Sequence, residues 1–106
     1  MSSEAEARAI AAQLLKEERF YEITLLTYLY HFPRGALLQD LREVVGRGKL
    51  ASAHRTLSFI EELKKMTLIE EERIKRFRLY KLTDKGRAVA KIFVEMMEGF
   101  TAKPAE

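Results

Sequence analysis

The apolar residues of this chain change their spacing near residue 67, and this change constrains the fold more than any other feature. Before it, they recur every three or four residues and so share one helical face, as in Ala53, Leu57, Ile60 and Leu63. The segments 67–72 and 77–82 instead favour two short strands, with Ile69, Tyr80 and Leu82 facing inward. After Thr83 the helical spacing returns. We therefore predict a mainly α fold with a small β-hairpin (α+β).

Capping and breaking residues divide the helical part into five segments. The first begins with the capping-box pattern Ser3-Glu4-Ala5-Glu6 and reaches a charged patch at 16–19. Four more helices are expected over 20–32, 36–45, 50–66 and 84–98, and residues 36–37 form a brief strand in an alternative reading. Thr83 is expected to cap the last helix, and Gly99 to end it. The helix 20–32 is apolar around most of its circumference, which is typical of a central or shared helix.

Composition excludes several classes of function. The absence of Cys excludes a disulfide scaffold, a Cys-based zinc site and a thiol nucleophile, and two histidines make a His-built metal site improbable. Residues 46–50 (GRGKL) lack the spacing and the hydroxyl of a phosphate-binding loop. Two histidines give no nucleophile–base–acid set, and the acids lie mainly on solvated faces, so we expect no enzyme activity and no cofactor. No apolar stretch is long enough to span a membrane, and the acidic start does not resemble a secretory signal, so we expect a cytoplasmic protein.

Charge is unevenly distributed along the chain. The net charge of +3 conceals a basic middle, because residues 47–91 hold thirteen Lys or Arg against six Asp or Glu. The remaining residues hold six basic against ten acidic side chains. The densest stretch, 73–81 (RIKRFRLYK), carries five positive charges and no acid, which is typical of a phosphate-contacting element. A strand edge protected by charge is the alternative interpretation. Low Asn and Gln content with 33% charged residues is also a thermophile tendency.

A helix–turn–helix followed by a basic hairpin is the winged-helix arrangement. Two motifs, together with the apolar helices at both ends of the chain, carry a family resemblance. Residues 80–86 (YKLTDKG) are close to a Tyr-x-Leu-Thr-x-x-Gly motif, and residues 60–70 (IEELKKMTLIE) join a leucine-rich helix end to Leu-Ile. The chain thus resembles the winged helix-turn-helix transcription regulators of the PadR and MarR kind, of archaeal type, over residues 22–100. Those families commonly have Gly where this chain has Thr67. The resemblance implies DNA binding and dimerisation through apolar end helices.

The helix 50–66 is expected to enter the major groove, because its first half is polar and its acids come later. Arg55 is the best choice for a base-edge contact with guanine, although pairing with a neighbouring acid is the alternative. The wing, 72–78, is expected on the minor groove or its phosphates. Arg78 lies two residues before Tyr80 in the same expected strand, so both side chains share one face, and Arg78 is expected to lean toward the body. The predicted DNA-binding residues are Arg47, Lys49, Ser52, His54, Arg55, Ser58, Arg73, Lys75, Arg76 and Arg78.

The chain ends are expected to form a dimer. We divide the chain into a dimerising helix (1–20), a DNA-binding winged helix (21–83) and a dimerising helix with a loose tail (84–106). The predicted dimer residues are Ile10, Leu14, Tyr21, Leu25, Tyr28, Val89, Ile92, Phe93, Met96 and Phe100. They form apolar faces that a single winged helix would leave exposed. In the alternative, the end helices pack on each other within one chain.

The sequence therefore predicts a homodimeric, nucleoid-associated regulator that binds double-stranded DNA without chemistry of its own. Two alternatives remain: a winged helix that serves as a protein-interaction module in a larger complex, and a nucleoid-type protein with little sequence preference. The aromatic segment 20–32 also permits a small-molecule effector of unknown identity.

Overall fold

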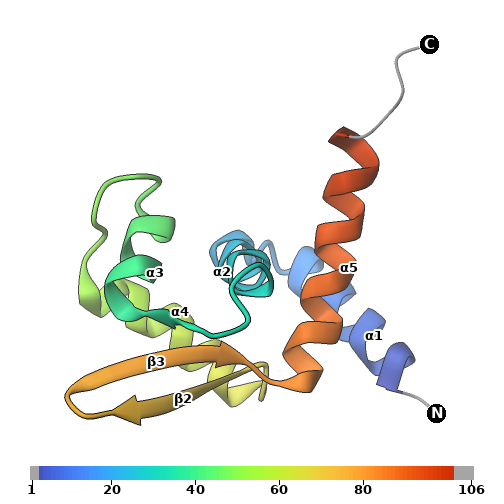
Figure 1. Cartoon of the computed structure of the whole chain (residues 1–106). Helices are drawn as coiled ribbons and strands as arrows, with labels where there is room; N and C mark the ends of the chain where they lie inside the picture. Colours follow the sequence, from blue (N-terminus) through green and yellow to red (C-terminus); the bar gives the residue numbers. More distant parts are fainter. Residues whose placement is uncertain (1–2, 102–106) are drawn as a thin grey trace.

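The computed structural model describes residues 3–101 and the side chains of residues 4–99. Five helices and a three-stranded antiparallel sheet make up this part of the chain (Figure 1). In chain order the elements are α1 (Ser3–Lys16), α2 (Phe20–Tyr30), β1 (Ala36–Leu37), α3 (Leu38–Val45), α4 (Ala53–Lys65), β2 (Ile69–Ile74), β3 (Phe77–Leu82) and α5 (Asp84–Thr101). The predicted fold class, mainly α with a small hairpin, is confirmed.

All the expected elements are present, but several boundaries differ by two or three residues. The first strand of the hairpin was expected over 67–72 but spans Ile69–Ile74, because the turn takes only Lys75 and Arg76. The recognition helix was expected to begin at residue 50, but α4 begins at Ala53 because Ser52 caps it. The last helix was expected to end at Gly99, which is wrong, because α5 continues to Thr101. The brief strand at Ala36–Leu37 is present. The side chain of Ser3, expected to cap α1, lies outside the described residues.

The sheet has the strand order β1-β3-β2, with β3 in the middle. β2 and β3 are joined by a two-residue turn at Lys75 and Arg76, with Ile74 opposite Phe77. Lys75 has a φ of +57°, the kind of positive angle that tight hairpin turns need. Ile69, Tyr80 and Leu82 are buried, as their alternation predicts. The hairpin projects from the body on the side away from α5 (Figure 1).

The α2 helix lies at the centre of the molecule, between the helix-turn-helix and α5 (Figure 1). Leu25, Leu26 and Leu29 of this helix are fully buried. They meet core residues from every other helix, which explains why α2 is apolar around most of its circumference.

The end helices pack on each other within the chain, which corrects part of the expected dimer surface. α1 lies against α5 and buries Ala7, Ala11 and Leu14 there. Four residues predicted for the dimer interface are therefore core residues of one chain, with at most 3% of their surface exposed: Leu14, Leu25, Val89 and Phe93. A side chain that is already buried in its own chain offers no surface to a second copy. The side chain of Phe100 lies outside the described residues.

The start of α5 is fixed tightly to the joint between α4 and β2. The Thr83 hydroxyl accepts a hydrogen bond from the Gly86 amide (2.9 Å) and donates one to the Thr67 carbonyl (2.6 Å). Thr83 is thus the N-cap that the sequence predicted. Thr67 has a φ of +58°, so it adopts the left-handed conformation that Gly would take at this position. The joint therefore keeps its shape despite the substitution, although this φ is costly for a β-branched residue.

Within residues 3–101, none of the helices is both long and apolar enough to cross a membrane.

Candidate nucleic-acid interface

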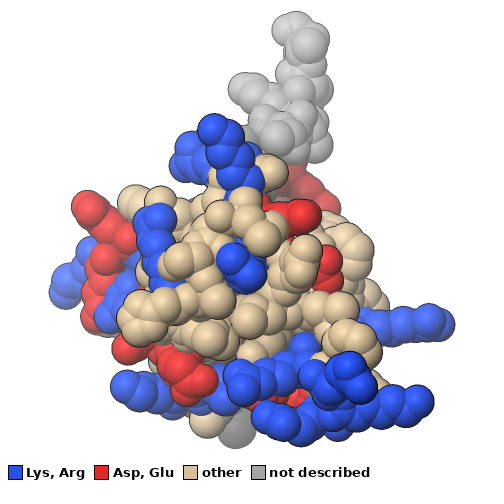
Figure 2. Space-filling view, turned by 90° about the vertical axis from the view of Figure 1, so that its left-hand side faces the viewer, with Lys and Arg blue, Asp and Glu red and all other residues tan. Residues whose placement is uncertain are grey.

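All ten residues predicted to bind DNA are solvent-exposed. They lie on three consecutive parts of the fold: the loop between α3 and α4, the first half of α4, and the β2–β3 hairpin, which we call the wing. Figure 2 views the molecule from the side on which the wing projects and shows Lys and Arg side chains crowded along the lower edge of this face. Further Lys and Arg side chains lie near the top of the same face.

The N-terminus of α4 has a well-defined cap. The Ser52 hydroxyl accepts a hydrogen bond from the Arg55 amide at 3.0 Å, so its oxygen is already used by the helix. The Ser58 hydroxyl donates to the Arg55 carbonyl at 2.7 Å. Both serines thus have structural roles beside the DNA contacts that the sequence predicted for them. His54 and Arg55 point outward from the first turn of the helix.

Arg55 lies on an aromatic platform that the sequence did not reveal. The rings of Tyr21 on α2 and Phe59 on α4 stack with centroids 5.0 Å apart. The Arg55 guanidinium lies over the Tyr21 ring, 4.6 Å from its centroid, and 5.7 Å from that of Phe59. Such a cation–π contact holds the guanidinium in place without neutralising its charge. Tyr21 was predicted for the dimer interface, but these contacts are with α4, because α2 packs against α4.

The loop before α4 is held by two hydrogen bonds between Arg42 and Ala51. The Ala51 amide donates to the Arg42 carbonyl at 3.0 Å, and the Arg42 Nε donates to the Ala51 carbonyl at 2.8 Å. A Cβ at Gly46 would lie 1.8 Å from the Lys49 carbonyl oxygen, so only glycine fits this turn. Arg47 and Lys49 are thereby presented at the entrance to α4, as the sequence predicted.

The wing concentrates positive charge at its tip. Arg73 and Arg78 are direct partners across the two strands, an arrangement of like charges that destabilises a hairpin by itself. Lys75 and Arg76, in the turn, make no ion pair with any side chain that the structure describes. The wing tip therefore carries positive charge that no described side chain neutralises.

The base of the wing is neutralised by acids. Glu71 accepts a hydrogen bond from Lys64 of α4 at 3.0 Å and lies 3.7 Å from the Arg78 guanidinium. The hydrogen bond from Lys64 lowers the pKa of Glu71, and the same bond raises the pKa of Lys64. Arg78 thus leans toward the body, as its position on the same face of the strand as Tyr80 predicted. Glu72 accepts a hydrogen bond from Lys81 at 2.8 Å, which raises the pKa of Lys81.

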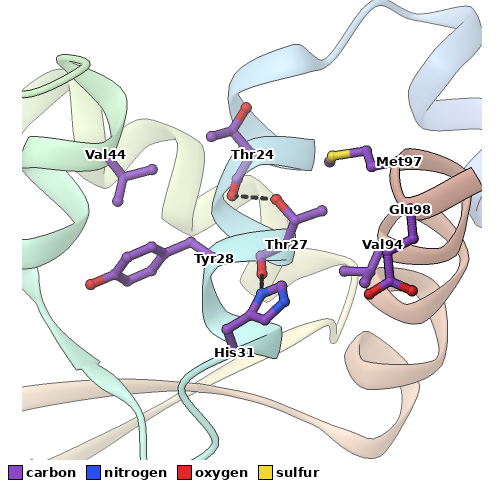
Figure 3. A pocket seen from close by; sticks show the side chains of 8 residues that line it. All are labelled: Thr24, Thr27, Tyr28, His31, Val44, Val94, Met97 and Glu98. Atoms are coloured by element: carbon purple, nitrogen blue, oxygen red, sulfur yellow. Dashed lines mark hydrogen bonds between the residues drawn. The ribbon is translucent and has the colours of Figure 1, made fainter. Parts of the chain in front are cut away.

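A cavity of about 350 Å³ lies between α2, α3 and α5 (Figure 3). Its lining combines apolar groups with hydrogen-bonding side chains: Thr24, Thr27, Tyr28, His31, Val44, Val94, Met97 and Glu98. The His31 Nδ1 lies 3.0 Å from the Thr27 carbonyl, and the Thr27 hydroxyl donates to the Thr24 carbonyl. Tyr28, predicted for the dimer interface, lines this cavity and stacks on Phe32. Among the described side chains, no group of three His, Asp or Glu could hold a metal ion.

A second hollow, of about 330 Å³, separates the wing from the start of α3. Arg42, Arg76 and Arg78 surround it, and Leu37, Leu38 and Phe77 provide apolar walls. Arg42 and Phe77 were not predicted from the sequence to lie in this lining, nor was the exposure of Ile74 at the wing tip. Ile74 and Phe77 stand within the basic stretch, and their exposure could have been inferred from the turn between them.

These features define a winged helix-turn-helix: a short helix, a turn, a recognition helix with a polar first half, and a basic hairpin. No family model matches the sequence, and it has no significant match among curated proteins. Solved structures do match its fold.

Three of these structures illustrate the match. A MarR family transcriptional regulator from Silicibacter pomeroyi DSS-3 has a TM-score of 0.71 and 19% identity, covering 96% of this chain and 71% of that chain. MepR, a transcription regulator of the Staphylococcus aureus multidrug efflux pump MepA, has a TM-score of 0.63 and 22% identity. The match covers 96% of this chain and 78% of that chain. SSV1 F-93 has a TM-score of 0.62 and 21% identity, and the match covers 79% of this chain and 92% of that chain. The resemblance to winged-helix transcription regulators is thus confirmed at the level of the fold.

Proposed function

We propose that this protein is a transcriptional regulator that binds double-stranded DNA. The observation that carries the proposal is the exposed, unneutralised positive charge at the wing tip, next to a recognition helix whose first half is polar. The fold that it shares with transcription regulators supports the same function. No catalytic chemistry is needed for it.

In the proposed complex, α4 enters the major groove with its N-terminal half. Arg55, held over Tyr21, reaches the O6 and N7 atoms of a guanine, and His54 lies beside it. Arg47 and Lys49 contact phosphates where the helix begins. The wing lies along the adjacent minor groove, where Arg73, Lys75 and Arg76 meet the phosphates, and Arg78 contributes from the base of the wing.

We further propose that the functional unit is a homodimer formed through α1 and α5. Leu15 on α1 and Met96 on α5 are exposed apolar side chains outside the DNA-binding part, and Ile10 and Ile92 are only partly buried. Burying them against a second copy would remove this apolar surface from water. A two-fold dimer would also place two recognition helices about 34 Å apart, one turn of DNA.

Fluorescence anisotropy with a labelled duplex of about 30 base pairs, repeated over a salt series, tests DNA binding. We expect the logarithm of the association constant K for DNA to fall steeply with the logarithm of the salt concentration, because phosphate neutralisation releases counterions. A flat dependence, or no binding at about 50 mM salt, would contradict the proposal. Co-purification of a protein partner without DNA affinity would then favour a protein-interaction module. A small ratio of specific to non-specific affinity would instead indicate a nucleoid-type protein.

A further inference from the structure

The tip of the wing exposes two apolar side chains that the DNA contacts described above do not use. Ile74 and Phe77 oppose each other across the turn and are 45% and 55% exposed. Direct cross-strand partners point to the same side of a sheet. By strand alternation this side is opposite to the one that buries Tyr80. Because the hairpin projects from the body (Figure 1), the protein's own core cannot cover this pair.

The charges around this apolar pair restrict what can cover it. Lys75 and Arg76 lie in the turn between Ile74 and Phe77, while Arg73 and Arg78 are next to them in the two strands and face the opposite side; no acid occurs between residues 73 and 81. A partner that covers the two apolar side chains must therefore also accept several positive charges. Duplex DNA has this combination, because stacked apolar base faces lie between two lines of phosphates.

We infer that Phe77, with Ile74 beside it, inserts between two base pairs from the minor groove while the neighbouring cations hold the flanking phosphates. Apolar wedges of this kind unstack a base step and kink the duplex. Flexible pyrimidine–purine steps open most easily, so the wedge would select its site by deformability rather than by hydrogen bonds. This inference rests on the proposed function, because it requires the wing to lie on DNA.

The local packing suits this role. Phe77 lines the hollow between the wing and α3 together with Leu37 and Leu38, and it is 55% exposed. The two-residue turn also keeps the hairpin tip narrow. A narrow tip is needed to approach base pairs through a minor groove about 6 Å wide.

A matched control residue exists in the same chain. Phe20, at the start of α2, is 58% exposed, close to the value for Phe77. Its neighbour Arg19 pairs with Glu17 at 3.1 Å and with Glu22 at 3.4 Å, so the surroundings of Phe20 are not a site of free positive charge. Replacing Phe20 therefore removes a similar apolar surface from a place that is not expected to touch DNA.

The test measures how much the bound protein unwinds DNA. A relaxed closed-circular plasmid is incubated with the protein, treated with topoisomerase I and deproteinised, and the change in linking number is read on an agarose gel. Binding to the same plasmid is measured in parallel by gel shift, so that variants are compared at equal occupancy. The wild-type protein, Phe77→Ala, Phe77→Lys and the control Phe20→Ala are compared, and thermal unfolding establishes that each variant is folded.

We expect the wild type and Phe20→Ala to change the linking number equally, and Phe77→Ala to reduce the change at least about fivefold at equal occupancy. Phe77→Lys adds a cation, so we expect it to bind at least as tightly while it also loses the unwinding. Equal unwinding by the wild type and Phe77→Lys would overturn the inference. Binding by the wild type without any change in linking number would also overturn it, while the proposed function would stand. Absence of DNA binding at about 50 mM salt would instead overturn the proposed function, and the wedge with it.

Discussion

The guanidinium of Arg55 lies over the ring of Tyr21, 4.6 Å from its centroid, although 34 positions separate the two residues in the chain. No ion pair with an acid competes for Arg55 among the described side chains. The alternative interpretation of Arg55 as half of a surface salt bridge is therefore wrong. An aromatic platform restrains the side chain while leaving its five N–H donors available to a base edge.

Arg55→Ala is expected to relax sequence preference at one base pair of the bound site. A bidentate contact between Arg and guanine discriminates by about 1–3 kcal/mol, so the selectivity at that position should fall by roughly tenfold or more. Selection of bound fragments from a randomised duplex pool, for the wild type and for the variant, measures this. Tyr21→Leu serves as a second variant that keeps apolar contact with Phe59 and should cause a smaller loss. Identical selected sequences for the wild type and Arg55→Ala would count against the assignment.

Arg76→Ala is expected to weaken binding to all sequences by a similar factor and to reduce the slope of log K against log salt concentration by about 1. The reason is that Arg76 makes no ion pair in the described structure, so its charge is available for a phosphate. Lys81→Ala is the matched control, because Lys81 is on the same hairpin and loses the same charge, but it is paired with Glu72 at 2.8 Å. The two variants are compared by anisotropy, and equal slopes would contradict the prediction.

Gly86→Ala is expected to lower the free energy of unfolding by about 3 kcal/mol, because the new Cβ would lie 1.8 Å from the carbonyl oxygen of Leu68. That oxygen also accepts a hydrogen bond from the Thr83 amide at 3.0 Å, so it cannot move without breaking the contact between the start of α5 and the connection from α4 to β2. Gly99→Ala in the same helix has open space around the new methyl group and should be neutral or stabilise by up to about 1 kcal/mol. Urea unfolding of both variants checks the contrast.

Glu71→Gln is expected to destabilise the protein by about 1 kcal/mol at neutral pH, through loss of its pair with Lys64. Because folding lowers the pKa of Glu71, its contribution is present above the unfolded pKa of about 4.5 and is lost as the pH falls through the folded value. The difference between the wild type and Glu71→Gln should therefore shrink below about pH 4.5. Urea unfolding of the wild type and of Glu71→Gln across pH 3–7 measures this difference in the free energy of unfolding.

Met96→Glu is expected to shift the proposed homodimer toward monomers, because it would place a charge within the apolar contact between the α5 helices. Leu50→Glu is a matched control, since Leu50 is 47% exposed and Met96 45%, and Leu50 lies in the loop before α4. Multi-angle light scattering at micromolar concentration distinguishes the two states. A monomeric wild type would contradict the dimer proposal.

Much of the fold could be predicted because its signals are local. The period of two in residues 77–82 placed Tyr80 and Leu82 inward, and the Thr83 cap fixed the start of α5. The prediction that the last helix ends at Gly99 was wrong, because a helix tolerates a glycine at a small cost and α5 continues to Thr101. The role of Ser52 as a cap was likewise hidden, because a serine near a helix start can serve either the backbone or a ligand.

The sequence by itself determined the order of the elements, the segregation of positive charge into the recognition helix and the wing, and the inward faces of the strands. These follow from spacing and composition within short segments. Only the tertiary structure decided that Leu14 and Phe93 belong to the core of one chain, that Glu72 neutralises Lys81 while Arg76 keeps its charge, and that Tyr21 supports Arg55. Each of these outcomes depends on the distance between side chains from different elements, and that distance is set by packing rather than by position in the chain.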